Sequence, residues 1–136
     1  MVLGGCYSFA EPSYHPGDAR QVLLAIALHG VSVSSSVGGE SACNDAGLIG
    51  NALHLRGSVA SDPTTRDIYI YTFKSNKWEG SQPAVDACQS VYQAAMGVAA
   101  VTRIDIPTYR AFGADWSAEL ITALRDALAQ AATAGS

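Results

Sequence analysis

The chain has 136 residues, 49% of them hydrophobic and 15% charged, which is typical of one folded domain and excludes a largely disordered protein. Its formal net charge is -4, and its eight lysines and arginines are scattered, which argues against nucleic-acid binding and against polybasic docking to a membrane. The longest apolar run, residues 22–28, is far shorter than a membrane span.

The first third of the chain predicts an arm followed by a helix. Residues 1–15 combine glycine, proline and aromatic residues, so we expect an extended N-terminal arm, with a single α+β domain over residues 16–136. A helix should start near Pro16 and Asp18, because proline suits a first helical turn and an acidic residue suits the positive end of the helix dipole. Gly30 should end that helix as a left-handed cap.

The middle of the chain alternates strands with helical turns. We expect a half-exposed strand at 31–37, one or two helical turns within 40–50, and a strand at 52–59. A loop at 60–66 with Asp62-Pro63 as its turn signal should lead to a strand at 67–74 with apolar residues on both faces. After a turn at 75–77, the clearest helix runs from Ser81 to Gly97. Its apolar stripe consists of Ala84, Cys88, Val91, Tyr92 and Ala95.

The last third predicts a strand, an aromatic segment and a helix. The strand covers 98–106 and stops at Pro107. The segment Thr108–Ala114 connects this strand to a final helix, which Asp115 caps. That helix should bury Trp116, Leu120, Ile121, Leu124 and Leu128. Together the elements predict an α+β two-layer sandwich of about four mainly antiparallel strands, with a split βαβ-like core and an extra helix at each end.

The cysteines bear on the cellular compartment. Cys43 and Cys88 could form a disulfide that closes a loop of about 45 residues, and the chain-entropy model assigns such a loop roughly 4 kcal/mol. Such a bond persists in oxidising compartments. The alternative is that Cys88 is a buried free thiol within its apolar stripe. Neither cysteine lies in a Cys-x-x-Cys pair or has a histidine beside it in the sequence, so a catalytic cysteine is disfavoured.

The residues Leu3-Gly4-Gly5-Cys6 resemble the bacterial lipobox, whose cysteine is lipidated. The resemblance covers four residues, and the charged start and apolar stretch of a secretory signal are not among the residues that precede Cys6. It implies that Cys6 is a lipidation site and that the membrane is reached only through a lipid tether. Cellular placement outside the cytoplasm, with Cys43 and Cys88 paired, is therefore favoured over the cytoplasmic alternative.

No metal or cofactor signature is present. The three histidines, His15, His29 and His54, have no ligand spacing of the His-x-His or His-Glu-x-x-His type, so we expect no metal and no cofactor. Gly38-Gly39 lacks the lysine and spacing of a P-loop and is interpreted as a turn.

One face of the predicted sheet carries the only candidate ligand site, and no residue is assigned a catalytic role. Polar side-chain groups beside a layer of aromatic rings are typical of a surface that binds a small organic or acidic ligand. A solvated sheet surface that needs no ligand is favoured over this interpretation, and the face could instead be covered by a terminal helix or by a second subunit. The candidate residues are His54, Arg56, Tyr69, Tyr71, Arg103 and Asp105.

Three functional hypotheses follow. The preferred one is a non-catalytic binding or interaction module of an extracytoplasmic lipoprotein type, whose partner is an unidentified protein or small ligand. The second is a cytoplasmic enzyme or enzyme subunit with a small-ligand pocket on the His54, Arg56, Tyr71 and Arg103 face. The third is a homo-oligomeric structural protein that buries the aromatic sheet face.

Overall fold

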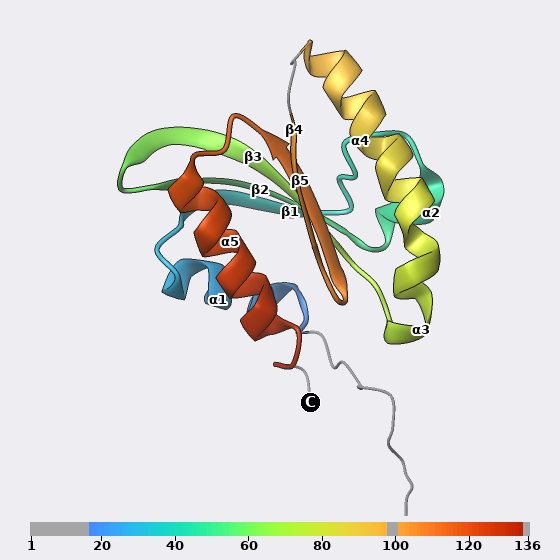
Figure 1. Ribbon diagram of the computed structural model, residues 1–136, viewed down its shortest axis with the longest axis horizontal. Coiled ribbons are helices and arrows are strands. Elements are labelled where there is room, and N and C mark those ends of the chain that lie inside the picture. The colour runs from blue at the N-terminus through green and yellow to red at the C-terminus, as the bar shows by residue number, and fades with distance from the viewer. Residues whose placement is uncertain (1–16, 98–100, 135–136) are drawn as a thin grey trace, which may run out of the picture.

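A computed structural model describes residues 17–97 and 101–134 (Figure 1). The predicted N-terminal arm, Cys6 and the first residues of the strand predicted at 98–106 lie outside the described residues. In chain order the elements are α1 (Ala19–Leu28), β1 (Ser32–Gly38), α2 (Ala46–Ile49), β2 (Ala52–Val59), β3 (Asp62–Thr72), α3 (Ser75–Trp78), the 3-10 turn η2 (Glu79–Ser81), α4 (Gln82–Met96), β4 (Val101–Ile106), β5 (Tyr109–Ala114) and α5 (Ala118–Ala131).

The strands form one antiparallel sheet in the order β1-β2-β3-β5-β4. The predicted α+β class and the antiparallel pairing are confirmed, with five strands rather than about four. Because β3 and β4 are both antiparallel to β5, they run parallel to each other with β5 between them. They are joined by α4, so β3, α4 and β4 make up the split βαβ unit of this fold.

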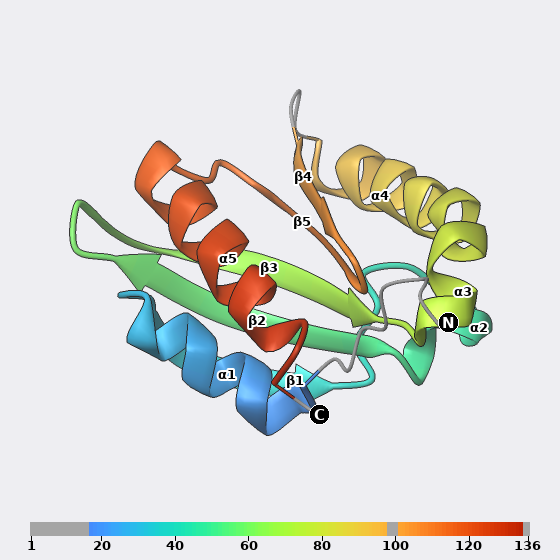
Figure 2. The ribbon, with the colours of Figure 1, turned by 60° about the horizontal axis from the view of Figure 1, so that its bottom comes forward.

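Helices cover both faces of the sheet, where the sequence predicted two layers. Helices α1 and α5 pack side by side on one face, and α4 lies on the opposite face (Figures 1 and 2). The α1/α5 face is mainly aliphatic and includes Leu55, Ile68 and Ile104, whereas the α4 face is richer in aromatic residues and includes Tyr71 and Phe112. Alternation along β3 explains this division, since successive side chains of a strand point to opposite faces.

The predicted ends of two helices are confirmed. Asp18 caps α1 through a capping box with Gln21, and Gly30 follows that helix with a φ of +94°. Gly97 ends α4 in the left-handed conformation. The buried stripe of α4 differs in part from the prediction: Val85 joins Cys88 and Tyr92 in the core, while Val91 is 52% exposed.

Two predicted loops are strands. The loop expected at 60–66 is wrong because β3 begins at Asp62, directly after a tight turn from β2. Strand β5 pairs with β3 only from Tyr69 to Thr72, so the start of β3 has an unpaired edge on that side. Pro63 is tolerated there because no backbone N–H is needed for a hydrogen bond to a neighbouring strand. The connection expected at 108–114 is β5, in which Arg110 breaks the apolar pattern.

Two local details also differ. Ser117, rather than Asp115, caps α5, because the Ser117 side chain accepts a hydrogen bond from the Leu120 amide. The turn expected at 75–77 is the single helical turn α3. Within the described ranges, no helix is long and apolar enough to cross a membrane.

Gly113 allows β5 to approach its neighbours closely, which generates a stability prediction. A Cβ at position 113 would lie closer than 3.0 Å to the Asp67 carbonyl oxygen and to the Trp116 indole nitrogen, which themselves form a hydrogen bond of 3.0 Å. We expect Gly113→Ala to lower the free energy of unfolding by about 2 kcal/mol or more, measured by urea denaturation.

The matched control is Gly80→Ala, because a Cβ at position 80 meets no atom within 4 Å. Its effect should stay within about 0.5 kcal/mol. Equal stabilities of the two variants would contradict the close packing at position 113.

Candidate functional site

Cys43 and Cys88 form a disulfide, which confirms the predicted pairing. Their Cα atoms are 5.3 Å apart, and 45 residues separate them in sequence. The bond joins the segment between β1 and α2 to the middle of α4, so it fastens a connecting segment to a core helix. A loop of this length corresponds to roughly 4 kcal/mol of stabilisation in the chain-entropy model.

The segment from Glu40 to Asp45 is fixed at several points besides the disulfide. The Tyr71 hydroxyl donates a hydrogen bond to the carbonyl oxygen of Ser41, a buried residue. Ala42 holds a φ of +69°, a left-handed conformation that costs a non-glycine residue roughly 1 kcal/mol. Asp45 ends the segment by capping α2, since its side chain accepts from the Gly47 amide. The segment therefore has a defined conformation beside α4.

His54 holds the start of this segment on the sheet. Its Nδ1 lies 2.6 Å from Glu40 Oε1, and its Nε2 lies 2.8 Å from Asp67 Oδ1. The ring stacks on Tyr69 with 4.2 Å between centroids. Carboxylates only accept hydrogen bonds, so a ring nitrogen that carries a proton donates to the carboxylate beside it. Both ring nitrogens therefore lie against carboxylates of this chain.

The same Asp67 carboxylate also pairs with Arg56, whose guanidinium lies 2.9 Å away. Asp67 lies close to Tyr69 in β3, and its negative charge adds to the effect of burial on the pKa of Tyr69. Burial and the Asp67 carboxylate raise the pKa of Tyr69 to about 12. Burial also raises the pKa of Tyr71 well above its usual value. These phenols are neutral hydrogen-bonding groups at physiological pH.

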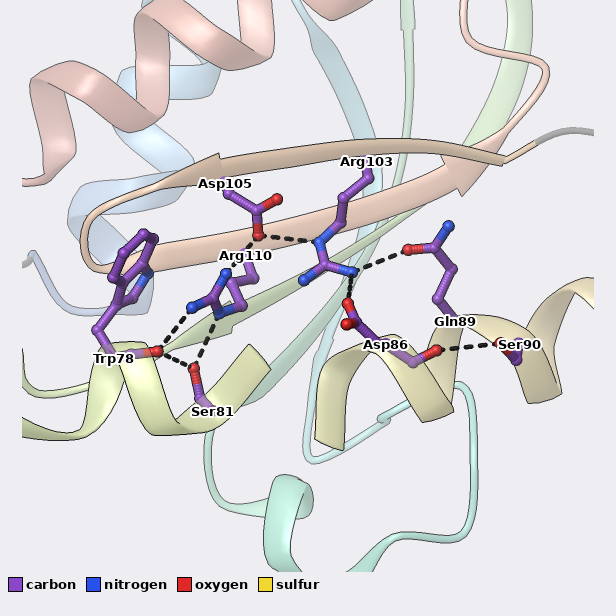
Figure 3. Close-up of polar contacts among 8 residues, drawn as sticks. All are labelled: Trp78, Ser81, Asp86, Gln89, Ser90, Arg103, Asp105 and Arg110. Atoms are coloured by element: carbon purple, nitrogen blue, oxygen red, sulfur yellow. Dashed lines mark hydrogen bonds and ion pairs between the residues drawn. The ribbon is translucent and has the colours of Figure 1, made fainter. Parts of the chain in front are cut away.

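Arg103 and Asp105 belong to a separate polar network at the other side of α4 (Figure 3). The Arg103 guanidinium lies 2.8 Å from Asp86 and 3.0 Å from Asp105, and it donates to Gln89. The contacts with Asp86 and Gln89 link β4 to α4. Asp105 in turn accepts from Arg110 at 2.7 Å.

Arg110 is the most buried charged group of this network, with 2% of its surface exposed. It donates to Ser81 Oγ, to the Trp78 carbonyl oxygen and to Asp105, and its guanidinium lies 4.1 Å from the Trp78 ring centroid. A buried cation with these partners is fully compensated, so Arg110 has a structural role between β5 and the start of α4.

The six predicted ligand residues share one face of the sheet, as their register requires, but α4 divides them into two groups. His54, Arg56 and Tyr69 lie with Glu40 and Asp67 on the β2 side. Arg103 and Asp105 lie on the β4 side, bound to α4. Tyr71 is fully buried in the aromatic core between the two groups. The aromatic face is therefore covered by this chain's own helix rather than open to a ligand or a second copy.

A groove of about 660 Å³ lies beside the disulfide, between the segment 39–44 and α4. We call it the disulfide groove. Its lining includes Glu40, Cys43, Ile49, Tyr69, Val91 and Ala95. Of the predicted ligand residues, Tyr69 alone borders it. Ile49 and Val91 present apolar side chains that are 46% and 52% exposed.

Sequence reasoning did not include Glu40, Asp67 and Arg110 in the site. The pairing of β2 with β3 brings Asp67 to His54, and the pairing of β1 with β2 brings the connecting segment with Glu40 to it. The alternation of Tyr109, Arg110, Ala111 and Phe112 was a strand signal that could have placed Arg110 in the sheet.

In the part of the chain that the structure describes, no group of three His, Cys, Asp or Glu side chains is arranged to hold a metal ion. Comparisons with protein-family models, curated proteins and solved structures find no match for this chain. The site must therefore be judged on its own geometry.

The buried tyrosines predict a loss of stability at high pH. Burial raises the pKa of both Tyr69 and Tyr109 from 10 to about 12. In the unfolded chain these phenols ionise near pH 10, while in the folded chain they stay protonated. The stability that the folded chain gains from these protonated phenols is therefore fully present below pH 10 and is lost as the pH rises toward 12. Urea unfolding on either side of pH 10 should show this decrease.

Tyr69→Phe is the matched variant, since it removes one ionisable phenol while it keeps the ring that stacks on His54. Its free energy of unfolding should fall less steeply above pH 10 than that of the wild type. Identical slopes for the two proteins would show that the Tyr69 phenol is not buried as described.

Proposed function

We propose that this chain is a non-catalytic binding domain that works outside the cytoplasm and holds a partner polypeptide in the disulfide groove. The observation that carries the proposal is the Cys43–Cys88 disulfide, because it fixes the two walls of that groove relative to each other. Disulfides form and persist mainly in oxidising compartments, which supports the extracytoplasmic placement. Lipidation at Cys6 stays a prediction and would add a membrane tether.

Preorganisation of the groove supports a role in binding. A wall that is ordered before the ligand arrives avoids the entropy cost of ordering it during binding. The segment 40–45 meets this condition through the disulfide, the Ser41 contact with Tyr71 and the Glu40 contact with His54. The left-handed Ala42 lies within this wall, and backbone strain of this kind concentrates at functional sites.

The chemistry of the groove indicates the kind of partner. Exposed Ile49 and Val91 offer apolar contact, and Tyr69 supplies an aromatic surface with a polar tip. Glu40 places a half-exposed carboxylate at the rim, and no lysine or arginine is among the lining residues. A polypeptide segment with one apolar anchor side chain and a nearby basic residue fits these features.

The polar groups of the same face favour structural roles over catalysis. His54 uses both ring nitrogens to hold Glu40 and Asp67, and Arg103 and Arg110 are paired with carboxylates. The four residues of the alternative enzyme hypothesis, His54, Arg56, Tyr71 and Arg103, lie on two sides of α4 or beneath it. This arrangement supports a binding domain.

Selection from a random peptide library on the immobilised, oxidised domain tests the proposal. We expect enriched peptides that carry an apolar residue beside a basic one, with binding weakened at least about tenfold by Val91→Arg. The substitution puts a cation and a longer side chain at the groove, at a position where the native side chain is 52% exposed.

The matched control is Leu24→Arg, which changes an equally exposed apolar residue of α1 on the opposite side of the sheet. It should leave binding unchanged. Peptides that bind the Val91→Arg variant as well as the wild type, or the absence of any enrichment, would overturn the proposal.

A further inference from the structure

A second cavity lies between α2 and α3, apart from the disulfide groove, and has a volume of about 540 Å³. This volume falls within the range of small-molecule sites, roughly 300 to 1,000 Å³. We call it the α2–α3 cavity. Its lining comes from the capped start of α2, the end of β3, α3 with the following 3-10 turn, and the first turn of α4.

The floor of this cavity is apolar and firmly packed. Leu48 and Phe73 are 3% and 7% exposed and belong to the aromatic core cluster, and Ala84 packs against the same cluster. These side chains are held in place whether or not the cavity is filled. An apolar body of a ligand would find a preformed surface there.

The rim of the cavity carries both lysines of the chain, Lys74 and Lys77. Neither forms an ion pair in the described parts of the chain, whereas Arg56, Arg66, Arg103 and Arg110 are all paired with aspartates. Asp45 also borders the cavity, with its Oδ1 oxygen engaged by the Gly47 amide as the cap of α2. Two lysines without an ion pair in the described residues and one aspartate therefore line the same cavity.

The charge of the rim is unusual for this molecule. The chain as a whole has a formal net charge of -4, yet its two lysines border a single apolar cavity. Ammonium groups at the edge of an apolar floor are complementary to a ligand with an anionic head and an apolar body. Asn51 and Asn76 add amide groups at the same rim.

We infer that the α2–α3 cavity is a binding site for a small amphipathic carboxylate, whose apolar body lies on Leu48 and Phe73 and whose anionic group lies between Lys74 and Lys77. This site is independent of the proposed polypeptide groove. The two share no lining residue.

The experiment is an amide NMR titration of the oxidised domain with octanoate and with its neutral counterpart octanamide. Octanoate should give saturable shifts of the Leu48, Phe73 and Ala84 amides. The double variant Lys74→Gln/Lys77→Gln should bind octanoate about tenfold more weakly, because it removes both cations that would pair with the carboxylate. Octanamide should bind both proteins with the same low affinity.

Two further variants make the result specific. Arg20→Gln/Arg125→Gln removes two exposed cations of α1 and α5, across the sheet from the cavity, and should bind octanoate as the wild type does. Gly80→Leu should abolish binding of both probes, because position 80 lines the cavity and its Cβ direction is open. If Gly80→Leu does not fold, the lysine double variant decides the question.

Three outcomes would overturn the inference. These are octanoate affinity that is equal in the wild type and the lysine double variant, shifts that map to the disulfide groove instead, and shifts that do not saturate. Peptide binding and its loss in Val91→Arg are measured separately, so failure of this inference and failure of the proposed function are distinguishable.

Discussion

The covalent bond between Cys43 and Cys88 is the constraint on which the proposed binding groove depends. It joins a connecting segment to the middle of α4 across 45 residues of sequence, and both walls of the disulfide groove include residues beside it. Without the bond, the segment would be held by the Glu40 contact with His54 and by the Ser41 contact with Tyr71. Polar contacts of this kind contribute roughly one kcal/mol each, against roughly four for the loop closed by the disulfide.

Helix α4 is fixed on both of its sides, and the two proposed binding surfaces lie along its margins. On the β4 side, Arg103 links the sheet to Asp86 and Gln89 of α4. On the other side, the disulfide and the packing of Tyr92 against Tyr69 hold the helix. Packing fills the aromatic face beneath α4, and the two cavities described above lie where connecting segments meet this helix. The disulfide groove and the α2–α3 cavity both arise at such places.

Local signals in the sequence predicted much of the fold, and long-range pairing set the rest. The capping signals of Asp18, Gly30 and Gly97 and the alternation of β2 placed those elements correctly. The β5 strand was missed because aromatic residues near Trp116 resembled a packing segment, and because a strand partner cannot be identified from local pattern. The disulfide could be proposed by counting cysteines, whereas the contacts of His54 with Glu40 and Asp67 depend on strand register. Coverage of the predicted ligand face by α4 is likewise a property of chain topology.

The most direct test of the account is the state of the cysteines in protein purified from its native cells without reductant. The purified protein is alkylated under denaturing conditions, and its intact mass and peptides are measured before and after reduction. The account predicts that Cys43 and Cys88 remain unlabelled until the protein is reduced, and that one disulfide-linked peptide pair contains them both. Full labelling of both cysteines before reduction would contradict it, because the groove would then lack the bond that fixes its walls.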